Sequence, residues 1–558
     1  MSATAHPAPA PRGAGPRRAV TWPRRTGPLQ GLGPSLRLLV RRLRVQVLAW
    51  ALPLWLLLAV TPPAYEDVYP SLQEREPLVE SMRDTAGTRL LYGALPLPGR
   101  IGQLVQWETG TYLLICVGLM ATLLTCRAMR ADEDDGLVEA VRAAGVGRRV
   151  PFAAPVAVVL TVVTLLAAGV GGILHILTLT VAELTVGGAW AAAGTLAATG
   201  WAFTALTAAA CQLTRDGSAA RALALMTLGV SFGLRVTADE TTASWLRWLT
   251  PLGWRDIIRP YSENRAWPLL VCTGVSLAVL AGATALERHR EYLGGYLPDL
   301  SATRRRWRVR SHASLLARLT VRSTATWTVS VAALSALFGT MSGTITDLLA
   351  PGSRTAAYVG MMTAGDPVVQ FMSLLTVFTV LMVSIAVVQR VTGLVADERA
   401  GLTEVEAAAG VSRTRLLLTR ACAALIEGAG LLAVSGAVLA AFTAAQVTQD
   451  RAVERALVFT VTQLPGVATT VGLALALVGG APRRVPLVWA VVAWSAFAQF
   501  LGGLVELPGW AIDLSVIGHH LDVTGPANWK PLAVQAAVGA AGAVIGLVAH
   551  RRRDLVAW

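Results

Sequence analysis

Long apolar stretches recur along the whole chain, and they constrain its fold more than any other feature. Each is roughly 18 to 25 residues long, enough for a helix to cross a hydrocarbon core of roughly 30 Å. The runs are continuous in Ala, Leu and Val, unlike the short alternating strands of a barrel, and only a helix satisfies its own backbone in lipid. Since 54% of residues are hydrophobic and only 15% are charged, we expect an all-α integral membrane protein.

Hydropathy predicts about twelve transmembrane helices in two halves. Those of the first half lie near residues 45–61, 104–128, 152–176, 188–211, 219–237 and 268–286. Those of the second half lie near residues 325–343, 368–391, 420–444, 456–480, 486–504 and 532–550.

The net charge of +14 comes almost wholly from arginine, since Lys530 is the only lysine. Arginines cluster in 12–44, 304–310 and 551–553. The positive-inside rule makes these three zones cytoplasmic, which requires about six spans in each half and places both termini in the cytoplasm. Arginine beside a span is ordinary topology and contacts lipid headgroups, so we expect membrane lipids and no nucleic acid as partners.

Composition predicts four parts of the chain. Residues 1–35 form a disordered, basic cytoplasmic tail, 36–290 the first half, 291–311 a cytoplasmic linker and 312–558 the second half. Each half opens on a basic amphipathic stretch, "SLRLLVRRLRVQ" and "SLLARLTVRS", which predicts an elbow helix in the inner interface. The five cysteines have no ligand spacing, so we expect neither a metal site nor catalytic residues.

One acidic segment occurs twice: "ADEDDGLVEAVRAAGVGRR" begins at Ala131, and "ADERAGLTEVEAAAGVSRTR" begins at Ala396. We call residues 131–148 the first cassette and 396–413 the second cassette. Each follows the second span of its half, so the two lie on the same, cytoplasmic face, which makes the repeat parallel. Identical residues are Asp132 and Asp397, Glu133 and Glu398, Gly136 and Gly401, Glu139 and Glu404, Gly145 and Gly410, and Arg148 and Arg413.

Each cassette is predicted to be a short amphipathic helix, with acidic residues at its start and a glycine stop at its end. In the second cassette Glu406 replaces the apolar Val141. Three interpretations compete. A metal site lacks the EF-hand spacing, and a plain charged loop does not explain duplication at the same topological place. The third is a helix that docks into a groove of a cytoplasmic partner.

A partner is also indicated by what the sequence lacks. It contains no G-x-x-x-x-G-K-[ST] phosphate loop and no soluble stretch long enough for a nucleotide-binding domain. If ATP drives this protein, ATP and Mg²⁺ therefore bind another chain.

The sequence resembles the membrane subunits of actinobacterial ABC exporters of the tetronasin/polyketide-antibiotic type, a group that includes a mycobacterial multidrug exporter permease. The resemblance extends from about Leu36 to Leu555 and rests on "GQLVQWETG", "WLTPLGWRDIIRPYSENRAWPLL", both cassettes and "RRRDL". It implies a cell-membrane permease of two fused six-helix halves, similar to the type V or ABC-2 fold, paired with two copies of a separate ATPase. It also implies that the two cassettes are coupling helices.

The leading hypothesis is ATP-driven export of bulky amphiphilic compounds such as antibiotics, drugs or lipids. Glutamates 133, 139, 398 and 404 would then pair with basic residues of the ATPase, and the cassette glycines would permit tight seating. The alternatives are a proton-coupled transporter of the major-facilitator type and a membrane enzyme or scaffold.

Candidate residues for a substrate pathway are ionisable or aromatic groups at membrane depth: Trp107, Glu108, Trp201, Glu427 and Trp494. Each has a structural alternative. Glu427 could bind a cationic substrate or pair with a neighbouring polar group, and tryptophans also form interfacial belts.

Overall fold

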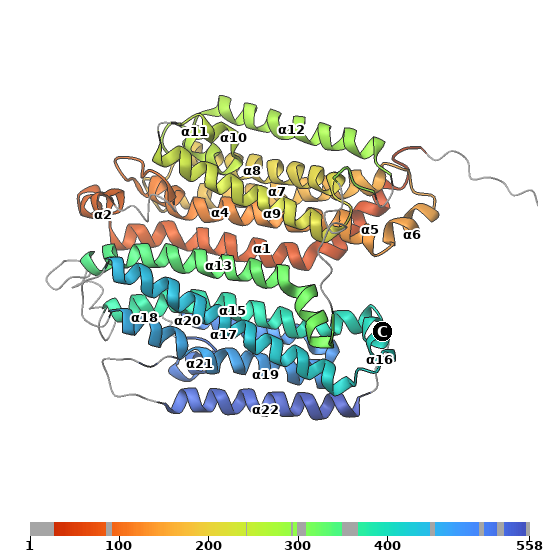
Figure 1. Cartoon of the computed structure of the whole chain (residues 1–558). Coiled ribbons are helices and arrows are strands. Elements are labelled where there is room, and N and C mark those ends of the chain that lie inside the picture. Colours follow the sequence, from red (N-terminus) through yellow and green to blue (C-terminus); the bar gives the residue numbers. More distant parts are fainter. Residues whose placement is uncertain are drawn as a thin grey trace, which may run out of the picture. The chain divides into compact units, whose positions relative to one another are not determined.

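A computed structural model gives the fold of the chain, which divides into two compact units, Met1–Arg304 and Arg305–Trp558 (Figure 1). The division falls within the predicted linker, 291–311. Within the described residues every regular element is a helix. The structure describes residues 27–84, 92–241, 243–291, 294–297, 309–348, 367–446, 452–501, 507–519, 521 and 529–553.

Ten helices in the described residues are long and apolar enough to cross a membrane. The sequence predicted about twelve. The two further predicted spans, 325–343 and 486–504, correspond to helices α13 (His312–Leu348) and α20 (Pro486–Leu501), which are not among the ten. Helix α20 has 16 residues and is therefore about 24 Å long, shorter than a hydrocarbon core of roughly 30 Å.

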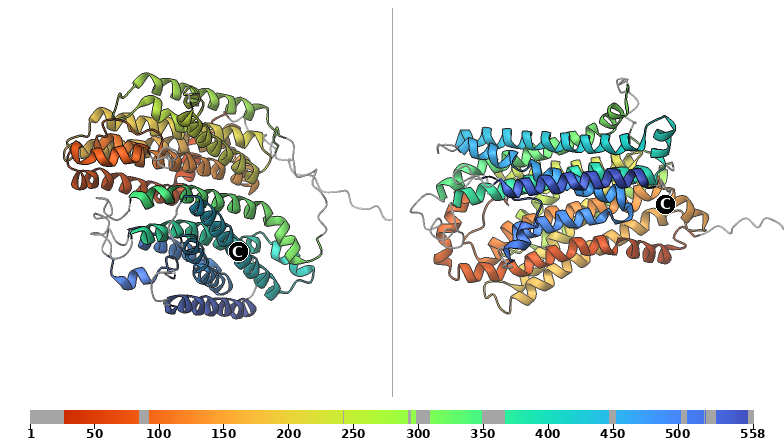
Figure 2. Two further views of the ribbon diagram at one scale, coloured as in Figure 1. Left: turned by 60° about the vertical axis from the view of Figure 1, so that its left-hand side comes forward. Right: turned by 90° about the horizontal axis from the view of Figure 1, so that it is seen from below.

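The first unit is built around helix α8 (Val186–Leu213), which contacts most of its neighbours. Its sequence is mainly Ala, Gly and Thr, and small side chains let adjacent backbones approach closely in a membrane protein. The long helices run side by side (Figures 1 and 2). The others are α1 (Leu32–Val68), α4 (Ile101–Cys126), α7 (Val150–Leu177), α9 (Gly217–Glu240) and α12 (Ala266–His289).

Short helices lie at the two ends of the first unit. Helix α6 (Leu137–Ala143) lies at one end of the bundle, and α2 (Leu72–Asp84), α10 (Leu246–Leu249) and α11 (Trp254–Ile258) lie at the other (Figure 1). Because α4 connects the two ends through 26 residues, they are separated by about 39 Å.

The second unit repeats this order of long helices. Helices α19 and α22 pack along most of their lengths, and α17 contacts both α13 and α15. The elements after α13 are α15 (Pro367–Arg399), α16 (Leu402–Ala408), α17 (Arg413–Gln446), α18 (Ala452–Val461), α19 (Leu464–Gly480), α20, α21 (Gly509–Asp513) and α22 (Lys530–Arg552).

The predicted elbow stretches do not form helices of their own. The first is the beginning of α1, a continuous helix of 37 residues, and the second is the beginning of α13, also 37 residues. On the α1 stretch Leu39 and Leu43 are buried while Arg37 and Arg41 are exposed. The amphipathic pattern is therefore present, but nothing in the sequence breaks the helix before the span. Most of the predicted tail and linker, 1–26 and 298–308, lies outside the described residues.

Candidate functional site: the two cassettes

The two cassettes have the same backbone conformation. Each contains a seven-residue helix, α6 or α16, that begins directly after a glycine with φ of +72°, Gly136 in the first and Gly401 in the second. Each helix ends just before a second left-handed glycine, Gly145 with φ of +82° and Gly410 with φ of +86°. The duplication seen in the sequence is thus also a duplication of structure.

Gly136 and Gly401 are required because of their left-handed backbone conformation, and not because neighbouring atoms leave no room for a side chain. A Cβ atom added at Gly136 or Gly401 would meet no other atom within 4 Å, yet residues with a Cβ are disfavoured at positive φ. This local break corrects one expectation. The first acidic residues do not start the short helix; they lie before the glycine, on the continuation of the preceding helix, α5 (Asp132–Asp134) or the end of α15.

Glu133 of the first cassette is bound inside its own unit. It is 5% exposed. One guanidinium nitrogen of Arg290 donates to both carboxylate oxygens of Glu133, at 3.0 and 2.8 Å. Arg290 directly follows α12, the last long helix of the first unit. Glu133 also pairs with Arg130 at 2.9 Å, and Arg130 donates to the carbonyl oxygen of Cys211 at 2.6 Å.

Glu398 makes the equivalent contact in the second unit. It is 7% exposed and accepts hydrogen bonds from Arg553 at 2.8 and 2.6 Å. Arg553 directly follows α22, the last helix of its unit. We call these two ion pairs, Glu133–Arg290 and Glu398–Arg553, the cassette anchors.

The arginine that closes each cassette repeats as well. The guanidinium of Arg148 donates to the carbonyl oxygen of Arg288 at 3.3 Å, and that of Arg413 donates to the carbonyl oxygen of Arg553 at 3.0 Å. Both acceptors lie at the end of the last helix of the unit. Each cassette is therefore bound to the C-terminal end of the last long helix of its unit twice, through Glu133 or Glu398 near its start and through Arg148 or Arg413 at its end.

The cassettes differ in their remaining contacts. Asp132 pairs with Arg42 of α1 at 2.6 Å, whereas Asp397 pairs with Arg420 of α17. Glu406 lies 3.6 Å from His312, the first residue of α13. The first cassette is thus paired with the first helix at Asp132, whereas in the second cassette Glu406 only lies near the first helix of its unit.

The outward faces of the short helices are exposed and mixed in character. Helix α6 exposes Leu137, with 42% of its surface accessible, and Glu139; α16 exposes Glu404 and Val405, the latter 68% accessible. Because the carboxylates of Glu133 and Glu398 are paired within the units, only Glu139 and Glu404 of the four predicted glutamates are free to face a partner.

The substrate-pathway candidates do not converge on one site within either unit. Trp107 is buried and donates to the carbonyl oxygen of Gly93 at 2.8 Å. Glu108 accepts a hydrogen bond from Tyr65 at 2.5 Å. Trp201 of α8 donates to Thr164 of α7 at 3.1 Å, and Trp494 of α20 stacks near Phe497.

Glu427, the candidate placed deepest in a span, has a partner in its own unit. Arg390 of α15 donates two hydrogen bonds to it, at 2.7 and 2.6 Å, and the pair is buried. Of the two interpretations of Glu427, the structure therefore supports pairing with a neighbouring polar group.

Sequence reasoning did not identify the arginines that complete these contacts. Arg290 lies 157 residues from Glu133, and Arg553 lies 155 residues from Glu398. The available signal was their equivalent position, directly after the last span of each half.

The fold defines a multi-pass membrane protein with a duplicated helical architecture and ten candidate spans in its described residues. A family model for the C-terminal domain of the multidrug efflux system permease Rv1217c matches residues 309–551. The multidrug efflux system permease protein Rv1217c of Mycobacterium tuberculosis is 30% identical over 546 residues, which cover 96% of this chain and 97% of that protein. The chain belongs to this family of multidrug efflux permeases.

Proposed function

We propose that this chain is the permease of an ATP-driven exporter and that α6 and α16 dock onto a separate dimer of ATPase subunits, which bind ATP and Mg²⁺. One observation carries the proposal: the two cassettes repeat the same glycine-bounded helix and the same anchor, while leaving the outward face of the helix exposed. A duplicated helix of this kind matches a symmetric partner, since each copy of a dimer offers one groove.

The anchors give each cassette two routes for transmitting a displacement. Through Gly136 the first cassette continues into α4, and through Arg290 it is tied to the end of α12. The second cassette continues into α15 and is tied through Arg553 to the end of α22. Movement of the ATPase subunits would therefore act together on α4 and α12 in the first unit and on α15 and α22 in the second.

The proposed topology has about twelve spans, six in each unit, with both termini in the cytoplasm. It adds α13 and α20 to the ten candidate spans, and the order of long helices in the two units supports it. The transported compounds would be drugs, as the name of the Mycobacterium tuberculosis relative, a multidrug efflux system permease, suggests. Within this class we propose bulky amphiphiles such as antibiotics, or lipids.

Charge reversal on the exposed faces tests the proposal. The full chain is co-expressed with ABC ATPase subunits of the same genome, and Glu139→Lys is combined with Glu404→Lys. We expect ATPase co-purification and drug export to fall at least about tenfold, because like charges now face each other across the interface. The matched control is Glu76→Lys with Asp513→Lys, which reverses one exposed acid per unit on α2 and α21.

Two results would overturn the proposal. One is a cassette variant that still co-purifies with the ATPase and exports drugs like the unaltered chain. The other is export that survives an ATPase unable to hydrolyse ATP but stops when an uncoupler dissipates the proton gradient, which would indicate a secondary transporter.

A further inference from the structure

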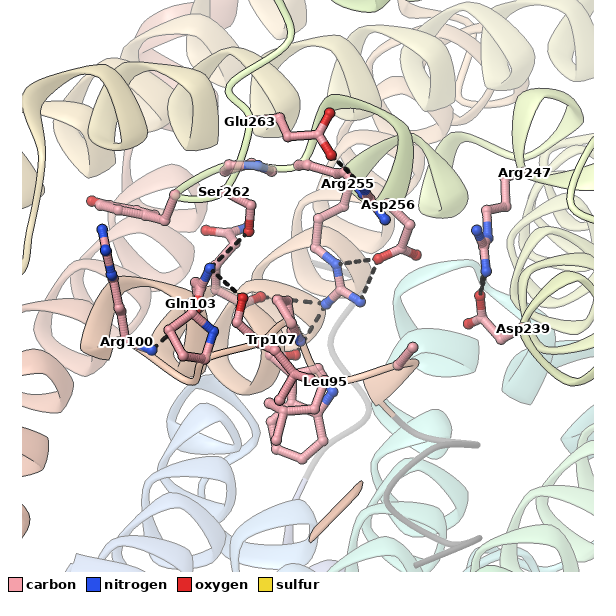
Figure 3. Close-up of a pocket in the computed structure, with 18 residues that line it drawn as sticks. Leu95, Arg100, Gln103, Trp107, Asp239, Arg247, Arg255, Asp256, Ser262 and Glu263 are labelled. Atoms are coloured by element: carbon pink, nitrogen blue, oxygen red, sulfur yellow. Dashed lines mark hydrogen bonds and ion pairs between the residues drawn. The ribbon is translucent and has the colours of Figure 1, made fainter. Parts of the chain in front are cut away.

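A cavity of about 630 Å³ lies in the first unit, and Figure 3 shows the side chains that line it. The start of α4 and helix α11 contribute to its wall, so it lies at the end of the bundle opposite the cassette (Figure 1). Its walls come from two segments that are far apart in the sequence, 94–107 and 239–263. These segments contain the first six residues of "GQLVQWETG" and most of "WLTPLGWRDIIRPYSENRAWPLL". Two of the stretches on which the family resemblance rests therefore meet at one cavity.

The wall of the cavity is held in a fixed arrangement by Arg255. This side chain is 5% exposed and donates to the carbonyl oxygens of Trp107 at 3.0 Å and Tyr92 at 2.5 Å. It also pairs with Asp256 at 3.0 Å (Figure 3). Since its donors are taken up by the protein, Arg255 joins the two wall segments and is not available to a ligand.

The loop that closes the cavity has an unusual backbone. Arg259, Tyr261 and Asn264 have φ values of +54°, +59° and +49°, a region that residues with a Cβ rarely occupy. Such conformations persist only where the surroundings enforce them, and they cluster at ligand sites. Here the ring of Tyr261 is held between helices: a Cβ at Gly102 of α4 or Gly188 of α8 would lie 2.4 or 2.3 Å from it.

Tyr261 also has an unsatisfied polar atom. The residue lines the cavity and is 8% exposed, and its hydroxyl is buried with no hydrogen-bond partner among the described residues. A buried hydroxyl without a partner is unfavourable. Because this oxygen is inaccessible and the ring lies between α4 and α8, Tyr261 shapes the wall of the cavity and its hydroxyl does not reach a ligand there.

The charges of the lining favour an anion. Four arginines and three acidic residues line the cavity, and the acids are already paired: Asp239 with Arg247, Asp256 with Arg255 and Glu263 with Arg259. Arg100 is different. Within the described residues its guanidinium has no hydrogen bond or ion pair, although its charge acts at longer range on Glu183.

The remaining lining is apolar. Leu95, Leu97 and three prolines line the cavity, and Leu97 is 57% exposed. The cavity thus offers one cation without a partner among the described residues and an apolar surface that reaches solvent or lipid. This combination suits a molecule with an anionic head and an alkyl body.

We propose that this cavity binds amphiphiles bearing a carboxylate or phosphate group, with Arg100 contacting the anionic group and Leu97 and the adjacent prolines contacting the apolar body. The site does not depend on the ATPase assignment, because it lies at the other end of the unit and its test is direct binding.

The test uses the full chain in nanodiscs of phosphatidylcholine, with dodecyl phosphate titrated by calorimetry. We expect saturable binding that Arg100→Gln weakens at least about tenfold, as loss of a charged hydrogen bond implies. Arg100→Lys, which keeps the charge, should retain most of the affinity, and neither Arg100 variant should lower the melting temperature, which separates a ligand contact from a structural role. Arg83→Gln, an exposed arginine of α2 outside the cavity, should bind like the unaltered chain.

Three outcomes would overturn the proposal: unchanged affinity in folded Arg100→Gln, equal binding of dodecyltrimethylammonium, or inorganic phosphate binding as tightly as dodecyl phosphate. The source of the natural ligand is decided by repeating the titration in phosphatidylglycerol nanodiscs. If phosphatidylglycerol abolishes dodecyl phosphate binding, and nanodiscs with a smaller fraction of phosphatidylglycerol in phosphatidylcholine restore it, the lipid competes for the cavity. This result assigns the site to an anionic lipid. Unchanged binding assigns it to a soluble amphiphile.

Discussion

At the scale of single residues, buried ion pairs explain the acidic groups that the sequence placed inside spans. Glu427 accepts two hydrogen bonds from Arg390, and Arg390 donates a further one to Thr324 at 2.6 Å. Removing one partner of such a pair leaves an uncompensated buried charge. We therefore infer a structural role for Glu427 in the second unit.

We predict that Glu427→Ala destabilises the chain by about 3–5 kcal/mol, whereas Arg390→Met combined with Glu427→Leu recovers most of the loss. Unfolding in detergent, followed by circular dichroism, measures both variants. A Glu427→Ala chain that unfolds like the unaltered one but no longer transports cationic drugs would contradict this assignment.

The pair of Glu183 with Arg75 predicts a pH dependence. Arg75 is fully buried and donates to Glu183 at 2.7 and 2.6 Å. These hydrogen bonds hold the pKa of Glu183 below its ordinary value of 4.5. A carboxylate whose pKa is lowered on folding stabilises the fold at pH values above its unfolded-state pKa. This stabilisation is lost as the pH falls through the folded-state pKa. The contribution of this pair to the melting temperature should therefore be constant between pH 7 and 5. The melting temperature should decrease below about pH 4.5, as the contribution is lost.

Glu183→Gln is the corresponding variant. It should melt lower than the unaltered chain at pH 7, because Arg75 loses its counter-charge, and the difference should narrow as the pH approaches 3. A constant difference across this range would contradict the lowered pKa.

The sequence singled out Glu427 but not the arginines beside Glu427 and Glu183. Glu427 stood out because a carboxylate within a span is costly unless it has a partner. Arg75 lies 108 residues from Glu183, on the short helix α2. Partners that only the fold brings together leave no local signal.

At the scale of elements, α19 and α22 pack backbone against backbone through glycine. A Cβ added at Gly472 would lie 2.0 Å from the carbonyl oxygen of Gly539, and one at Gly479 would lie 2.0 Å from that of Gly546. The glycines of α19 and α22 permit this close approach because they have no side chain. In lipid such contact replaces the hydrophobic effect as a source of helix association.

We predict that Gly472→Ala lowers stability by about 1–3 kcal/mol, because the two helices must separate. Gly430→Ala is the matched control, since a Cβ at this exposed position of α17 meets nothing within 4 Å. It should raise stability by up to about 1 kcal/mol through better helix propensity. Equal melting temperatures for the two variants would show that the close approach is absent.

Element boundaries were predicted less well than elements. Both cassettes were expected to start a helix with acidic residues, yet Gly136 and Gly401 place those residues on the preceding helix. The elbow stretches were expected as separate helices, yet they continue into α1 and α13. In each case hydropathy located the element, and a backbone feature that hydropathy does not measure decided where it ends.

At the scale of the whole molecule, the duplication is the feature that organises the chain. Two units of similar helix order each carry one cassette, and each cassette is anchored to the residue after the last helix of its own unit. The sequence showed the repeat through matching cassette residues. It did not show the anchors, because Arg290 and Arg553 lie outside the repeated segment.

The central claim is that α6 and α16 are the surfaces that meet the ATPase. Photo-cross-linking tests it directly, with a photoreactive residue placed at Leu137, at Val405 or at Leu179, which is 83% exposed and lies just beyond α7 at the end opposite the cassette. In membranes that contain the ATPase subunits, we predict cross-links to the ATPase from positions 137 and 405 and none from 179. Absence of cross-links from both cassettes while the subunits co-purify, or equal cross-linking from 179, would contradict the claim.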